Sequence, residues 1–217
     1  KAFMEIRKEF IQKYLVWLLI AVIVLIVLLV KFLGYAKKKN KATSLKVGRK
    51  SYWEELIYVF HLVFHPFDGF WDLKHEKRGS LRAAVVYIAL TILAFYYQSI
   101  GQGYVINPTN SYSTIWIQVI GVMVPFLLFV TANWCLTTLF EGEGSFKDIF
   151  VAVSYSLLPV PLLVIPATFA SNFVVNTEAS IVSLVVTIAM VWMGLLIFFG
   201  TMVTHDYSLG RNFLTFL

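Results

Sequence analysis

Charged residues are scarce in this sequence. Only 14% of its 217 residues are Asp, Glu, Lys or Arg, whereas 59% are hydrophobic and the mean hydropathy is +0.77. Soluble domains carry about 25% charged residues, so the composition excludes an ordinary soluble domain and predicts an integral membrane protein. Cysteine is almost absent too. The single Cys135 lies in an apolar stretch and has no second cysteine for an internal disulfide.

The long apolar stretches after residue 80 contain no Asp, Glu, Lys, Arg or His; these stretches are residues 83–97, 115–140, 149–170 and 181–203. Ion-coupled transporters and intramembrane proteases place ionisable groups inside their spans. The sequence also lacks a P-loop, a GxGxxG motif and a serine elbow. We therefore expect no enzyme, no catalytic residue and no cofactor.

The most apolar segment is "LVWLLIAVIVLIVLLV", Leu15–Val30, with sixteen residues and no polar side chain. Extended to residues 14–33, it reaches about 20 residues or roughly 30 Å of helix, enough to cross a bilayer. With the later stretches it predicts an all-α fold, a polytopic transmembrane helix bundle with a cytoplasmic interfacial amphipathic helix. We expect three regions: residues 1–40 with this extra span, 41–80 with a basic linker and the amphipathic helix, and 81–217 with the bundle.

Both ends of the sequence look cut, since it begins on Lys1 and stops at "RNFLTFL", the apolar start of a further span. We expect the natural protein to continue past at least one end. The uniform Val, Ile and Leu of residues 15–30 offer none of the small or polar contacts that hold helices together. This span is therefore expected to stand apart from the bundle.

Basic residues are distributed asymmetrically. Twelve of the 18 Lys and Arg lie between Lys31 and Arg82, whereas the connections 98–114 and 171–180 carry only Glu178. The positive-inside rule then predicts that residues 34–80, 141–148 and the tail after His205 are cytoplasmic and that the N-terminus is outside. The basic excess is expected to meet anionic lipid headgroups and not nucleic acid. The residues predicted to contact headgroups are Lys37, Lys38, Lys39 and Lys41.

An amphipathic helix is predicted before the second span. Its apolar face comprises Trp53, Leu56, Ile57, Phe60 and Phe64, and its polar face comprises Glu54, Glu55, Tyr58, His61 and His65. This pattern favours a helix lying in the membrane interface. Pro66 should end the helix, and Asp68 and Gly69 should form a turn.

His61 and His65 have the i, i+4 spacing of a helical zinc pair. No third ligand is obvious, although Asp68, Asp72 and His75 follow closely. We therefore predict solvent-facing histidines and no metal.

A partner-binding surface is predicted on the cytoplasmic side. The segment 53–71 holds more aromatic rings than anchoring a helix requires, and aromatic residues dominate binding hot spots. Glycines allow a tight backbone in the turn "EGEGSFKD", and Ser145 can cap the following helix. The residues predicted to form one platform are Phe67, Phe70, Trp71, Gly142, Gly144 and Ser145.

Three segments, "HPFDGFWDLKHEKRGSLRAAVVYIALTIL", "GEGSFKDIFVAVSYSLLPVPLLVI" and "THDYSLGRNFLTFL", resemble the YIP family, the Ypt/Rab-interacting five-span membrane domain. The resemblance covers about residues 60–217, and its motif residues here are Pro66, Asp68, Gly69, Tyr155 and Pro159. It implies a non-enzymatic membrane scaffold or accessory subunit that works with other membrane-protein subunits. The additional N-terminal span looks more like bacterial relatives, which places the protein in a bacterial plasma membrane.

Two alternatives remain open. A channel or permease subunit is favoured by a possible path along Gln118, Asn133 and the helix broken by three prolines. The polar residues of the spans, Gln118, Asn133, Ser154 and Ser156, are otherwise expected to make hydrogen bonds between helices. If the chain is eukaryotic, the resemblance implies an adaptor for small GTPases in vesicle traffic.

Overall fold

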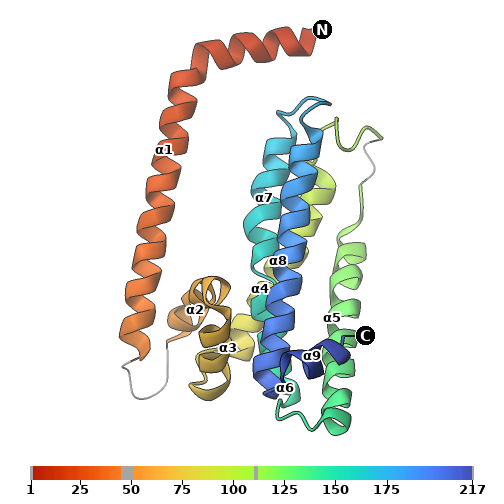
Figure 1. Cartoon of the computed structure of the whole chain (residues 1–217). Coiled ribbons are helices and arrows are strands. Elements are labelled where there is room, and N and C mark those ends of the chain that lie inside the picture. Colours follow the sequence, from red (N-terminus) through yellow and green to blue (C-terminus); the bar gives the residue numbers. More distant parts are fainter. Residues whose placement is uncertain (1, 45–50, 110–111, 217) are drawn as a thin grey trace. The chain divides into compact units, whose positions relative to one another are not determined.

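The computed structural model describes residues 2–44, 51–109 and 112–216, and the chain divides into two compact units, residues 1–47 and 48–217. The first unit is the single helix α1 (Ala2–Ser44) (Figure 1). It contains the predicted extra span, and its residues from Ile23 to Val30 are all exposed. That residues 14–33 cross the membrane and stand apart from the bundle stays a prediction. Residues 45–50 of the predicted basic linker lie outside the described residues.

The described part of the second unit is entirely helical, which confirms the all-α fold. Its helices are α2 (Tyr52–Phe64), α3 (Pro66–His75), α4 (Leu81–Gly101), α5 (Ile115–Phe140), α6 (Phe146–Ser156), α7 (Pro159–Ser171), α8 (Ala179–His205) and α9 (Leu209–Leu214). Among the described residues, the segments long and apolar enough to cross a membrane are 81–101, 115–137, 146–171 and 179–205. They coincide with the predicted spans after residue 80, so the bundle is a polytopic membrane bundle.

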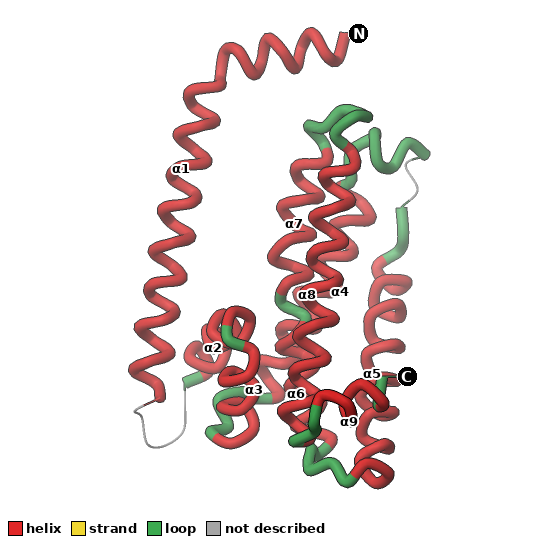
Figure 2. The backbone as a smooth tube through the Cα atoms, in the orientation of Figure 1, coloured by secondary structure: helices red, strands yellow, loops and turns green. Residues whose placement is uncertain are grey.

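The predicted span 149–170 consists of two helices. Figure 2 shows the interruption between α6 and α7, where Leu157 and Leu158 precede Pro159. Proline has no N–H to donate and clashes with the preceding turn, so two prolines, Pro159 and Pro161, start a new helix instead of continuing the old one. This broken segment is the most enclosed span. Inside the bundle, 72% of its most apolar window is buried, against 11% for α5 and 17% for α8.

The largest core cluster lies where α2 and α3 meet α4, α6 and α8. Val59 and Leu62 of α2, Tyr155 of α6 and Leu196 of α8 are all within 2% of complete burial. We call this end of the bundle the α3 end. The starts of α4 and α6 and the ends of α5 and α8 lie there (Figure 1). The opposite end, with connections 102–114 and 172–178, is the loop end.

The terminal helix α9 folds back onto α8. The Asn212 side chain donates to the Phe198 carbonyl at 2.8 Å and accepts from the Thr201 hydroxyl at 3.2 Å. Asn212 is fully buried. α9, which contains the start of "RNFLTFL", is thus hydrogen-bonded to α8 through Asn212.

Candidate functional site

Three tyrosine hydroxyls hold the α2–α3 hairpin together and against the bundle. Tyr87 of α4 donates to the Leu56 carbonyl, and Tyr155 of α6 donates to the Glu55 carbonyl at 3.1 Å. Within the hairpin, the Tyr58 hydroxyl lies 2.9 Å from the Gly69 carbonyl oxygen and 3.1 Å from Asp72 Oδ2. The hairpin is therefore an integral part of the packed unit.

A partly buried charge cluster lies beside Tyr58, in which Arg78 is buried and Glu76 is exposed. The Arg78 guanidinium lies 5.3 Å from the centre of the Tyr58 ring, and it pairs with Glu76 at 2.6 Å and with Asp72 at 3.5 Å. Burial raises the pKa of the Tyr58 hydroxyl, and the Asp72 charge raises this pKa further. Tyr58 therefore stays protonated and able to donate at neutral pH.

The predicted polar face of α2 is wrong for its first two turns. Glu54, Glu55 and Tyr58 are buried, with at most 8% of each exposed, whereas Trp53 and Phe64 are about half exposed. Glu54 closes a capping box by accepting from the Ser51 N–H at 2.9 Å. Glu55 accepts from the hydroxyl of Ser80, the residue that caps α4. These carboxylates face inward because they bind helix-capping groups, which periodicity does not show.

The predicted turn at Asp68 and Gly69 is also wrong, since both residues lie inside α3. Pro66 is the first residue of α3. An N–H at this position has no acceptor within the helix, so a proline there costs no hydrogen bond. Gly69 lies against α2, and a Cβ there would be 2.6 Å from the Leu62 Cα. Glycine at this position lets the two helices pack closely.

A surface hollow of about 360 Å³, which we call the α3 groove, lies between α3, the α5–α6 turn and the end of α8. Its lining residues are Phe67, Asp68, Trp71, Lys74, His75, Glu143, Met202, Val203, Asp206 and Tyr207. The structure thus brings the predicted aromatic segment and the predicted turn to one surface.

The predicted platform aromatics divide into two kinds. Phe67 and Trp71 are 51% and 52% exposed and line the groove. Phe70 is only 1% exposed and packs where α8 has Gly200, so its prediction as a contact residue is wrong. Phe67 and Phe70 are three residues apart and therefore neighbours on the helix surface. Only the packing of α3 on α8 decides that Phe70 is buried while Phe67 stays exposed.

The glycines of the α5–α6 turn fit closely around α8. A Cβ on Gly142 would lie 2.4 Å from the Tyr207 hydroxyl, and one on Gly144 would lie 2.9 Å from the His205 ring. Ser145 caps α6 as predicted, since its hydroxyl accepts from the Asp148 N–H at 3.3 Å. Gly142, Gly144 and Ser145 shape the turn; that they touch a partner stays a prediction.

Lys74 joins α3 to this turn. Its ammonium lies 2.9 Å from Glu143 Oε2. The hydrogen bond from Lys74, followed by its positive charge, lowers the pKa of the Glu143 carboxyl. Because the Glu143 side chain is exposed to solvent, this ion pair contributes little to the stability of the fold. Its main effect is to fix the position of the turn against α3.

The sequence did not identify the polar contact beneath the groove. His205, the last residue of α8, is 1% exposed, and its Nε2 lies 2.7 Å from Asn133 Oδ1 on α5. Its ring stacks on Tyr207 with centroids 4.9 Å apart. The interhelical bond predicted for Asn133 is confirmed. The sequence offered one signal for His205, because this histidine follows the apolar stretch 181–203 by two residues, where the last span ends.

The predicted interhelical bonds of Ser154 and Ser156 are wrong. Their hydroxyls donate to the carbonyls of Phe150 and Ala152, one turn earlier in α6. A serine in an apolar helix finds its own backbone more readily than another helix.

The remaining predicted residues lie as follows. Tyr155 is fully buried, and Pro159 is the buried first residue of α7. Lys37, Lys38, Lys39 and Lys41 lie in the C-terminal part of α1, and their contact with headgroups stays a prediction. His61 and His65 stack with ring centroids 4.9 Å apart, and burial lowers the pKa of the half-buried His61. Within the described ranges, no cluster of three His, Cys, Asp or Glu could hold a metal.

The fold and the groove define a polytopic helical membrane protein with a charged, aromatic surface at one end of its bundle. The chain belongs to the Yip1 family, because the Yip1 domain matches residues 60–217. The match contains α3 to α9 and the whole α3 groove. No curated protein matches the chain, and no solved structure matches it.

Proposed function

We propose that this protein is a non-enzymatic membrane scaffold, or accessory subunit of a larger membrane complex, which binds a partner protein through the α3 groove. The observation that supports this most is the pair of half-exposed rings, Phe67 and Trp71, on a helix whose other side is packed on the bundle. Large rings in a polar rim are the side chains from which binding hot spots are built.

The charges of the groove indicate the chemistry of the partner. Asp68, Glu143 and Asp206 surround a single ammonium, that of Lys74. The groove is therefore net negative, and a partner segment with Arg or Lys beside an apolar anchor complements it. An Arg guanidinium can also stack on the exposed indole of Trp71.

The basic residues near α3 and α4 favour a cytoplasmic position for the α3 end. With the predicted extra span, it supports a bacterial plasma-membrane protein whose N-terminus is outside the cell and whose α3 groove faces the cytoplasm. The partner is then a cytoplasmic segment of a neighbouring membrane subunit.

The proposal is tested by purifying the full chain from its native membrane with the double substitution Phe67→Ala and Trp71→Ala. The matched control is Trp116→Ala with Phe173→Ala, two exposed aromatics at the loop end. We expect the co-purifying subunit to be lost from the groove variant alone. Asp68→Lys should weaken the same association, because it reverses a charge that a basic segment needs.

Retention of the subunit by the groove variant, or equal loss in both variants, would contradict the proposal. Steady flux of a defined solute through the isolated, reconstituted chain would favour the channel alternative instead.

A further inference from the structure

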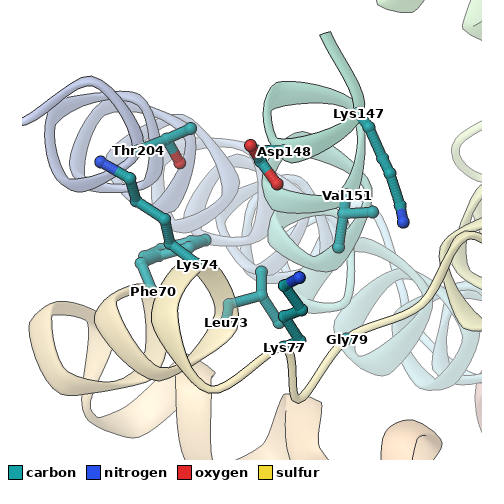
Figure 3. A pocket seen from close by; sticks show the side chains of 9 residues that line it. All are labelled: Phe70, Leu73, Lys74, Lys77, Gly79, Lys147, Asp148, Val151 and Thr204. Atoms are coloured by element: carbon teal, nitrogen blue, oxygen red, sulfur yellow. The ribbon is translucent and has the colours of Figure 1, made fainter. Parts of the chain in front are cut away.

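Lys74 also lines a second, smaller hollow at the α3 end. This cavity of about 70 Å³ lies between α3, the connection from α3 to α4, α6 and the last turn of α8 (Figure 3). Admitting one water requires only about 10–15 Å³, so the cavity has room for several waters or one tetrahedral oxyanion. We call it the lysine cavity, because Lys74, Lys77 and Lys147 all line it.

The three lysines come from separate parts of the fold. Lys74 lies in the last turn of α3, and Lys147 in the first turn of α6. Lys77 lies between α3 and α4 with a left-handed backbone, φ 49°. These lysines line one cavity because α3 packs on α6 and α8, although their side chains extend in different directions (Figure 3).

Little negative charge opposes these ammonium groups. Within the described part of the chain, neither Lys77 nor Lys147 has a carboxylate within ion-pair distance. Asp148 also lines the cavity, but its Oδ2 accepts from the Ser145 hydroxyl at 2.5 Å in the α6 capping box. Glu143, the ion-pair partner of Lys74, is 66% exposed, so the pair is weak and Lys74 can exchange this carboxylate for another anion.

The cavity lies at the ends of two helical segments that are long and apolar enough to cross a membrane. The membrane span that contains α6 begins at Phe146, and α8 ends at His205, directly after the cavity-lining Thr204. The apolar side of the cavity is formed by Leu73 and Val151. A basic pocket between span ends is the arrangement that recognises phosphate-bearing headgroups. Lysines bind phosphate as point charges.

We propose that the lysine cavity binds the phosphate of an anionic lipid headgroup. The phosphate oxygens accept from Lys77 and Lys147, with Lys74 released in part from Glu143 and the Thr204 hydroxyl as a further donor. The acyl chains continue along the apolar surface of the bundle. The residues of this site differ from the basic stretch of α1, and the site shares only Lys74 with the α3 groove.

The test uses the full chain in neutral detergent micelles, titrated with dioctanoyl phosphatidic acid and followed by native mass spectrometry and thermal stabilisation. We expect saturable binding that Lys77→Gln with Lys147→Gln weakens on the order of tenfold or more. Lys77→Arg with Lys147→Arg should retain it. The matched control is Lys8→Gln with Lys13→Gln, which removes the same charge from the N-terminal part of α1, outside the residues predicted to contact headgroups, and should leave this binding unchanged.

Dioctanoyl phosphatidylcholine and inorganic phosphate complete the experiment. Weak binding of the zwitterionic lipid, and competition by phosphate only at much higher concentration, would support a lipid headgroup. Tight binding of inorganic phosphate without competition from phosphatidic acid would overturn the lipid assignment. Equal weakening by the α1 control, or unaltered binding in the Lys77 and Lys147 glutamine variant, would overturn the site itself.

Discussion

At the loop end of the bundle, the Gly103 N–H donates to the Ser171 hydroxyl at 2.8 Å, and Asn172 donates to the Gly101 carbonyl at 2.8 Å. At the α3 end, by contrast, the connections meet through the Lys74–Glu143 ion pair and a set of buried rings around Phe70. The loop end is held by neutral hydrogen bonds to the backbone, whereas the α3 end adds an ion pair and buried aromatic rings to bonds of that kind.

The two ends therefore differ in role. Contacts at the loop end close the bundle, whereas the α3 end leaves side chains available to recognise a ligand or partner. Neutral bonds at the loop end satisfy backbone groups and leave little charge for a ligand to meet. The α3 end uses buried aromatic area for its stability, so that its exposed rings, carboxylates and lysines remain available. The α3 groove is net negative and the lysine cavity net positive, and Lys74 lines both.

The largest effect is expected at the core of the α3 end. Phe70→Ala should lower the free energy of unfolding by about 3–5 kcal/mol, because it leaves a cavity beside Gly200. Trp71→Ala, the neighbouring half-exposed ring, should cost far less. Unfolding of both variants in detergent by a denaturant series checks this, and equal costs would show that Phe70 does not support the core.

A smaller effect is expected from crowding the loop end. A Cβ at Gly103 would lie 2.2 Å from the Ser171 carbonyl oxygen, so Gly103→Ala should destabilise by about 1–3 kcal/mol. Gly121→Ala on α5, where a Cβ meets nothing within 4 Å, is the control and should not destabilise. The same unfolding assay applies. If Gly103→Ala leaves the free energy of unfolding unchanged, Gly103 is not packed closely against Ser171.

Helix capping provides a matched pair of substitutions between the two ends. Ser145→Ala removes the hydroxyl that accepts from the Asp148 N–H and should cost about 1 kcal/mol. Thr114 caps α5 at the loop end without a side-chain hydrogen bond, so Thr114→Ala should cost less. Thermal midpoints of the two variants measure the difference, and the reverse order would contradict it.

The smallest effect concerns the ion pair. The pKa of Glu143 is lowered from its ordinary 4.5, so its stabilising contribution is present above that pH and is lost as the pH falls through the lower, folded value. Glu143→Gln should remove this acid dependence, and salt should weaken the pair at neutral pH. Glu141→Gln is the control, and thermal midpoints between pH 7 and 3 provide the measurement. An unchanged acid profile in Glu143→Gln would show that the pair does not contribute.

Composition and periodicity were sufficient for the membrane class and the four spans after residue 80, because transfer of apolar helices into a bilayer depends on local hydrophobicity alone. The proline break before Pro159 and the Ser145 cap were also readable, since both act within a few residues. The motifs around residues 65–97 and 142–164 were enough to indicate the family.

Tertiary structure alone decided which side of each amphipathic segment faces inward. Glu55 is buried because Ser80, 25 residues away, needs an acceptor, and Phe70 is buried because α8 offers Gly200. His205 meets Asn133 across 72 positions, and Lys74, Lys77 and Lys147 line one cavity only because α3 packs on α6. A local pattern identifies a polar or aromatic residue, but its partner is set by long-range packing, where burial and hydrogen bonding compete.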